Sequence, residues 1–193
     1  MSPTRVVLAE DEALIRLDLK EILIEEGYDV VGEAGDGASA LELIRDLQPD
    51  VAILDVMMPV MDGLTAAREI VAERLTAVVI LTAFAQRDLV EQAREAGAMS
   101  YLVKPYRRQE LAPAIELAVA RFSETSALAR EAASLAEQLA TRKLVDRAKG
   151  ILQDQLSMTE HDAFRFVQTT AMSRRTSMKV IAEAVIDGSL RPE

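Results

Sequence analysis

Over residues 1–120, short apolar runs alternate with stretches of helical period, and this alternation constrains the fold more than any other feature. The apolar runs lie at 5–9, 28–34, 51–56, 77–83 and 100–104. The stretches with helical spacing lie at 12–26, 38–47, 63–73, 87–97 and from about Gln109 onward. Since the two periods are typical of strands and amphipathic helices, we expect five strands and five helices in alternation.

Strands that are apolar on both faces and separated by helices indicate a parallel sheet covered on both sides. With right-handed crossovers, the expected fold is α/β, with a doubly wound, five-stranded parallel sheet. Ligands bind to such sheets at the carboxyl ends of the strands. In the helix at 12–26 we expect the buried stripe to be Leu14, Leu17, Ile22 and Leu23, with Gly27 ending the helix.

The composition narrows the possible classes of protein. A chain of 193 residues has room for one full domain and a smaller one. The absence of cysteine excludes a disulfide framework, thiolate catalysis and Cys-ligated zinc, and the single histidine, His161, excludes a multi-histidine metal site. No apolar stretch approaches the roughly 20 residues that span a bilayer, and the N-terminus lacks a signal-peptide pattern. We therefore expect a cytoplasmic protein without membrane contact.

Polar residues follow four of the five strands at the edge where ligands bind. Glu10 and Asp11 follow the first strand, Asp55 ends the third, Thr82 closes the fourth and Lys104 closes the fifth. Three carboxylates at one edge repel one another, and a divalent cation would offset that repulsion. With only hard oxygen ligands in reach, the expected cation is Mg²⁺.

This set of groups suits phosphoryl transfer to a carboxylate. Asp55 would attack phosphorus, Lys104 and Mg²⁺ would neutralise the phosphoryl oxygens, and the Thr82 hydroxyl would donate a hydrogen bond. Any one acid alone is more simply explained as a helix N-cap or a solvated loop residue. Because five residues of the required types each lie at a strand end, we predict that Asp55 is a phosphoacceptor. The chain would then modify itself, and we do not expect an enzyme with an outside substrate.

Residues 5–120 resemble the receiver domain of two-component response regulators, a CheY-like, flavodoxin-like fold. The resemblance is carried by "LAEDE" at Glu10 and Asp11, "ILDVMMPVMDG" around Asp55, "LTA" at Thr82, and "YLVKP". It implies a sensor histidine kinase as phosphodonor. It also implies a receiver domain over residues 1–120.

The receiver resemblance further implies roles for individual residues. Mg²⁺ would be held by Asp11, Asp55 and the backbone carbonyl of Met57, with Glu10 acting mostly through water. A cis peptide would precede Pro105. Thr82 and Tyr101 would rearrange on phosphorylation, although Tyr101 could equally be a half-buried strand aromatic.

After residue 108 the sequence predicts helices and no strands. Pro113 would lie in the first turn of a long helix that continues to about Leu156. We expect residues 121–140 to form a helical linker, overlapping a small three-helix bundle at 131–192. The 4-3-4 spacing of four linker residues indicates either a short coiled-coil seam between two chains or packing on the same chain. These residues are Leu128, Ala132, Leu135 and Leu139.

Two further helices complete the bundle. One is expected at 158–172, with Thr159 and Asp162 as a capping box. Its inner face would comprise Ala163, Phe166, Val167 and Thr170 or Ala171. The other would start near Thr176 and end at Gly188, with Met178, Ile181, Ala182 and Val185 turned inward.

The segments 142–152, 159–172 and 173–185 resemble the ANTAR domain, an RNA-binding antitermination module. The whole chain resembles PdtaR-type regulators, in which a receiver is followed directly by ANTAR. The resemblance places Ala148 and Gly150 where the first bundle helix packs closely. It implies binding of RNA hairpins that overlap transcription terminators.

The charge distribution is compatible with this expectation. Residues 1–140 carry a net charge of −12, whereas residues 141–193 carry +2. Guanidinium and ammonium groups bind phosphates, and guanidinium planes also stack on unpaired bases. The candidate RNA-binding residues are Lys143, Arg147, Lys149, Arg174, Arg175 and Lys179. A solvated basic face is the simpler alternative for each. The outer of Phe164 and Phe166 could stack on a base or pack on a neighbouring helix.

Two other outputs stay open. The helices at 158–172 and 176–187 could form a DNA-binding helix-turn-helix, but the amino-terminal face of the second carries only Lys179. The bundle could instead bind another protein. Phosphorylation would either release the tail from the receiver or allow a homodimer to form through the linker helix, and the sequence does not distinguish these mechanisms.

Overall fold

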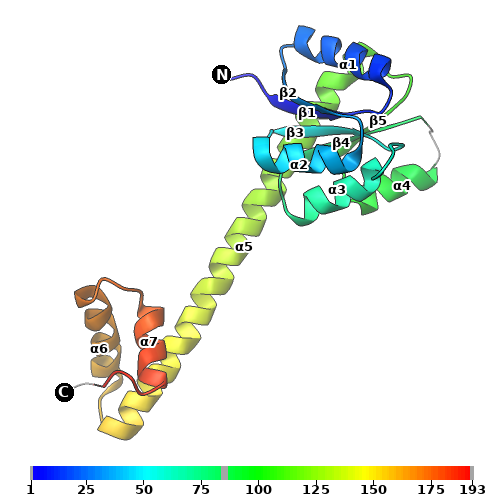
Figure 1. The fold of residues 1–193 in the computed structure, drawn as a ribbon. Helices are drawn as coiled ribbons and strands as arrows, with labels where there is room; N and C mark the ends of the chain where they lie inside the picture. Colours follow the sequence, from blue (N-terminus) through cyan, green and yellow to red (C-terminus); the bar gives the residue numbers. More distant parts are fainter. Residues whose placement is uncertain (1, 84–86, 192–193) are drawn as a thin grey trace. The chain divides into compact units, whose positions relative to one another are not determined.

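The structure, a computed structural model, describes residues 2–83 and 87–191, with side chains at 87–90 not described. It comprises two compact units, residues 1–127 and 128–193. The first unit contains a five-stranded parallel sheet in the order β2-β1-β3-β4-β5 (Figure 1). The strands are β1 (Arg5–Ala9), β2 (Asp29–Ala34), β3 (Val51–Asp55), β4 (Ala77–Thr82) and β5 (Ser100–Val103). The predicted doubly wound α/β fold is confirmed.

Helices cover both faces of the sheet (Figure 1). One core lies under α2 (Gly37–Leu47) and α3 (Gly63–Ala72), and includes Ala93 from α4 (Arg87–Glu95). The other lies under α1 (Ala13–Glu25) and the first part of α5 (Arg108–Leu156). Alternate strand residues feed the two cores: Ala52 and Leu54 face one, Val51 and Ile53 the other. This period of two leaves the strand ends as the place where polar groups can gather.

The buried face of α1 differs from the predicted stripe. Leu19 and Leu23 are fully buried, but Leu14 and Leu17 are 83% and 51% exposed. The helix contains two overlapping apolar stripes, and the one that includes Ile15, Leu19 and Leu23 has the continuous i, i+4, i+8 spacing that fits against the sheet. The prediction for Leu14 and Leu17 was therefore wrong.

Helix α5 is one continuous helix of 49 residues. Because the helix begins at Arg108, Pro113 lies in its second turn, whereas the prediction placed it in the first turn. The ring removes one helical hydrogen bond there, at an exposed position that water reaches. The seam residues Leu128, Leu135 and Leu139 are 55–59% exposed. They do not pack within the C-terminal unit, so their partner stays a prediction.

The C-terminal unit combines the last turns of α5 with α6 (Glu160–Ser173) and α7 (Met178–Ile186). Its core is small and aliphatic, with three residues from each helix. They are Val145, Ala148 and Leu152, then Ala163, Val167 and Ala171, then Ile181, Ala182 and Val185. Leu190, which follows α7, completes the core. Within the described ranges, no helix has the length and apolarity needed to cross a membrane.

Local capping fixes where the two short helices begin. The Thr159 hydroxyl accepts a hydrogen bond from the Asp162 backbone N–H at 3.1 Å, as the capping-box pattern predicts. The Ser177 hydroxyl accepts one from the Val180 N–H at 3.3 Å, so α7 starts after Ser177, two residues later than expected. The close packing expected at Gly150 is not present, because a Cβ there would meet nothing within 4 Å.

Candidate functional site

The carboxyl edge of the sheet brings three acids together. Strand β3 is buried along its whole length, so Asp55 at its end is only 6% exposed. Glu10 is fully buried and Asp11 is exposed. One carboxylate oxygen from each of the three residues lies within 4.8 Å of the others. This cluster is the arrangement of hard oxygen ligands that a small divalent cation requires.

Lys104, which directly follows β5, joins the cluster. Its Nζ lies 2.5 Å from Oε2 of Glu10 and 3.2 Å from Oδ1 of Asp55. The Lys104 backbone N–H donates to the Thr82 carbonyl at 2.7 Å, which fixes where the ammonium group enters. The peptide bond between Lys104 and Pro105 is cis. One ammonium therefore serves two buried carboxylates.

The pKa values in the cluster reflect burial first and neighbouring charges second. Burial raises the pKa of the Glu10 and Asp55 carboxyls, and the ammonium of Lys104 counteracts only part of that effect. Burial alone would lower the pKa of Lys104, but its hydrogen bond to Glu10 and the charge of Asp55 outweigh burial and raise it. The cluster holds more negative charge than one lysine balances, which favours a bound cation.

The loop after β3 is closed by backbone contacts. The Val56 N–H donates to the Leu81 carbonyl at 2.9 Å, and the Gly63 N–H donates to the Val56 carbonyl at 3.0 Å. A Cβ on Gly63 would lie 1.9 Å from the Asp55 carbonyl oxygen, so only glycine fits there. The α3 N-terminus therefore packs directly on the peptide of Asp55. At the tip of the loop, Val60 is 89% exposed and has φ of +64°.

The remaining receiver residues lie around this cluster. Thr82 is 3% exposed at the end of β4, on the strand next to Asp55. Tyr101 on β5 is 46% exposed, so both alternatives, a switch residue and a half-buried strand aromatic, stay open. The Met57 side chain is 68% exposed, and the ligand role of its carbonyl stays a prediction.

Sequence reasoning missed two residues beside the cluster. Arg16, in the first turn of α1, donates from its guanidinium to the Glu10 carbonyl oxygen. Its position five residues after Asp11 was the signal, because one turn of helix returns a side chain toward the preceding strand end. The second residue is Tyr106, which follows Pro105. Burial, together with the charges of Glu10, Asp18 and Asp55, raises the pKa of Tyr106 to about 12.

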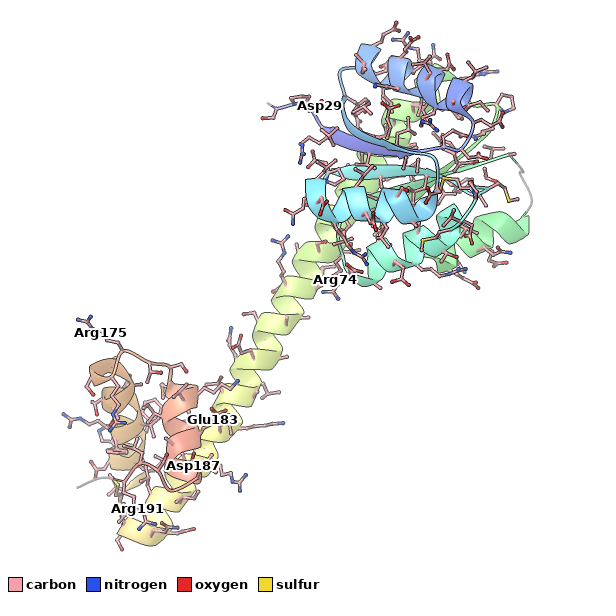
Figure 2. The ribbon with its side chains drawn as sticks, in the orientation of Figure 1. Asp29, Arg74, Arg175, Glu183, Asp187 and Arg191 are labelled. Carbon is pink, nitrogen blue, oxygen red and sulfur yellow. The ribbon has the colours of Figure 1, made fainter. Side chains whose placement is uncertain are left out.

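The candidate RNA-binding cations lie in the C-terminal unit and are mostly exposed. Arg175, at φ of +51°, extends into solvent from the connection between α6 and α7 (Figure 2). No described residue forms an ion pair with Lys143, Arg147, Arg174, Arg175 or Lys179.

Lys149 differs from the rest of this set. Its ammonium lies 2.9 Å from a carboxylate oxygen of Asp146 and 2.9 Å from one of Glu160. The lysine thus links α5 to the start of α6. Two acids thus compete with RNA for its charge, and its role as an RNA contact stays a prediction.

Comparison with known proteins identifies both units. Residues 6–116 match the response regulator receiver domain family, and residues 133–186 match the ANTAR domain family. The chain belongs to the response regulator family. This response regulator is 60% identical over 185 residues to the transcriptional regulatory protein PdtaR of Mycobacterium tuberculosis (strain ATCC 25618 / H37Rv), covering 96% of this chain and 90% of that protein.

Relatives of the receiver alone are more distant. The chemotaxis protein CheY of Bacillus subtilis (strain 168) is 36% identical over 112 residues, covering 58% of this chain and 93% of that protein. The structure of the signal receiver domain of the response regulator NarL from Mycobacterium tuberculosis is 38% identical, with a TM-score of 0.59, covering 62% of this chain and 98% of that chain. The acidic cluster and Lys104 therefore lie in a receiver domain, and the candidate RNA-binding cations lie in an ANTAR output domain.

Proposed function

We propose that this response regulator accepts a phosphoryl group on Asp55 from a sensor histidine kinase, and that phosphorylation controls the binding of RNA hairpins by its ANTAR domain. The observation that carries the proposal is the position of Asp55: it is buried at a strand end, 3.2 Å from the ammonium of Lys104, among two further acids. The chain acts on its own carboxylate and on no outside substrate.

The acidic cluster fits Mg²⁺. Its donors are all carboxylate oxygens, the type that Mg²⁺ prefers, and their convergence within 4.8 Å is costly without a cation. Asp11 and Asp55 would hold the ion, with Glu10 close by. When bound, Mg²⁺ neutralises charge that develops on the transferred phosphoryl group.

The chain's own residues position the reaction. A carboxylate oxygen of Asp55 forms a bond to phosphorus as the bond from phosphorus to the donor's histidine nitrogen breaks, and the electron pair of that bond stays on the nitrogen. Lys104 favours the ionised form of Asp55, which the attack requires, and then neutralises charge on the phosphoryl oxygens. Glu10 holds the ammonium in place from the other side at 2.5 Å.

The output side of the proposal is supported by the ANTAR match and by the cations of the C-terminal unit that form no ion pair with a described residue. Arg174 and Arg175 are consecutive and exposed where α6 gives way to α7, and a guanidinium group can bind a phosphate bidentately. We propose that the bound RNA contains hairpins that overlap transcription terminators. Binding would then let transcription continue past the terminator.

A binding experiment tests both parts together. The full chain is titrated with a two-hairpin RNA and with duplex DNA, with and without acetyl phosphate and Mg²⁺. We expect RNA binding to tighten only when Asp55 is phosphorylated, with an Asp55→Asn variant showing neither phosphoryl uptake nor the gain. A gain that persists in Asp55→Asn would disprove the control mechanism. Binding to duplex DNA but not to RNA would instead make the tail a DNA-binding module.

A further inference from the structure

The C-terminal unit has an open groove. The groove has a volume of about 620 Å³ and is bounded by α5, α6 and α7. Its apolar wall includes Val145, Phe164 and Met178, each from a different helix. A hollow with an apolar wall at the meeting point of three helices is a typical place for a small planar group to bind.

Phe164 is the unexplained member of this wall. Its neighbours in sequence and on the next turn, Ala163 and Val167, are fully buried in the core of the bundle. Phe164 is instead 40% exposed and does not belong to that core. A large aromatic ring that borders an open groove and lies outside the core offers a flat apolar surface to a ligand.

The rim of the groove carries both hydrogen-bonding and charged groups. Gln138 and Thr141 offer donors and acceptors, and Arg142 offers a guanidinium whose one ion-pair contact among described residues is with Asp146 at 4.0 Å. Glu137 and Asp146 also line the groove. These carboxylates repel a phosphate, but they accept hydrogen bonds from the ring N–H or exocyclic amine of a base.

The groove is therefore suited to a nucleobase, while phosphates would bind outside it. The cations available for phosphates belong to the same unit: Lys143 and Arg147 follow the groove residues along α5, and Arg165 follows Phe164 on α6. Recognition of single-stranded RNA commonly combines stacking of an unpaired base on an aromatic ring with such backbone contacts.

We propose that this groove is a base-binding pocket, in which an unpaired base from an RNA loop stacks on Phe164 and is read by the polar rim. The inference rests on the proposed RNA-binding function and deepens it. It separates two kinds of contact in one domain: Phe164 for the base, and the exposed arginines and lysines for the backbone.

The test compares Phe164→Leu with Phe164→Trp in the full, phosphorylated chain. The probe is a two-hairpin RNA with unpaired purines in its loops. We expect Phe164→Leu to lose roughly 5- to 150-fold in affinity and Phe164→Trp to stay within about twofold of the original chain. Val180→Ala, which shortens another exposed apolar residue (49% exposed) in the same unit, is the matched control and should bind normally.

Two further measurements assign the loss to a base. The dependence of log K on log salt should keep its slope in Phe164→Leu, because no phosphate contact is lost. RNA whose loop purines are replaced by abasic sites should bind the original chain and Phe164→Leu equally.

Three outcomes would overturn the inference. The first is equal affinity of Phe164→Leu and the original chain for the intact RNA. The second is a loss of affinity that persists with the abasic RNA. The third is a loss that accompanies a change in sedimentation, since the groove would then be a contact between two copies of the chain. If the original chain binds no RNA at all, the proposed function itself fails. That result differs from a defect seen only in Phe164→Leu, which leaves the proposed function intact.

Discussion

The two units of this protein use charge in opposite ways. In the receiver, Glu10, Asp55 and Lys104 converge in a buried cluster in which one ammonium contacts both carboxylates within 3.2 Å. In the C-terminal unit, Arg174 and Arg175 are exposed, and no described residue pairs with them. A buried cluster fixes a chemical reaction by geometry. An exposed set provides attraction over a surface, which depends on salt and tolerates the loss of single members.

The largest expected effect concerns backbone packing under the receiver cluster. Gly63→Ala should lower the free energy of unfolding by about 3 kcal/mol or prevent folding, because its Cβ would overlap the Asp55 carbonyl oxygen. Gly150→Ala is the matched control in the other unit. It should gain about 0.5–1 kcal/mol, since the added methyl meets nothing and alanine favours helix. Urea unfolding measures both, and equal effects would show that the close approach at Gly63 is not real.

The second prediction concerns the exposed arginines of the C-terminal unit. Replacing Arg174 and Arg175 together by alanine should weaken RNA binding roughly tenfold at low salt and flatten the slope of log K against log salt by about 1.4. Phosphoryl uptake by Asp55 should be unchanged, because the variant leaves the receiver intact. Fluorescence anisotropy at several salt concentrations is the measurement. An unchanged slope would place the phosphate contacts elsewhere on the unit.

The third effect is a dependence of receiver stability on pH without Mg²⁺. Folding raises the pKa values of Glu10 and Asp55. The folded chain therefore binds more protons than the unfolded chain at pH values between the ordinary carboxyl pKa and the raised values. Stability should therefore fall as pH rises from about 4 through the raised values. Asp55→Asn should weaken this dependence and gain on the order of 1 kcal/mol at pH 7.

Asp36→Asn provides the control of opposite sign. Hydrogen bonds from Ser39 lower the pKa of Asp36, so its contribution to stability is present above the ordinary pKa and is lost as pH falls. The asparagine variant should lose stability at pH 7 and not gain it. A gain in both variants would point to net charge in general and not to the buried cluster.

The smallest effect concerns Lys149. Its alanine variant should show a small decrease in unfolding temperature, because the links to Asp146 and Glu160 are lost, with RNA affinity and salt slope nearly unchanged. Calorimetry measures the contribution of Lys149 to stability, and the same anisotropy assay measures its contribution to RNA binding. A slope as flat as that of the double arginine variant would show that Lys149 also contacts RNA phosphates.

The sequence predicted the receiver well because its signals are local and topological. Strands β3 and β4 are buried along their whole length and β1 nearly so. The topology of a parallel sheet then forces Asp55, Thr82 and Lys104 to one edge. The stripe on α1 could not be predicted from spacing alone, because Leu14 and Leu19 both belong to plausible apolar stripes and only packing on the sheet selects one.

The C-terminal unit was harder to predict for a related reason. Lys143 and Lys149 look alike in the sequence, but only Lys149 has acids at the right distance, and one of them lies on another helix. Likewise, Phe164 and Phe166 differ by two positions, and the structure shows that Phe166 packs on the core while Phe164 borders the groove. Exposed sites depend on tertiary neighbours that a linear pattern does not contain.

The closed loop after β3 has a consequence for how this surface can diversify. The hydrogen bond from Gly63 to Val56 joins the two ends of the loop, so the exposed tip at Val60 is separated from the peptide of Asp55. Substitutions at the tip can alter the outline that an approaching protein meets while the Asp55 carboxylate keeps its place. The positive φ at Val60 favours asparagine or glycine there. Related chains could thus acquire different partners by changing one exposed residue, with the same chemistry beneath it.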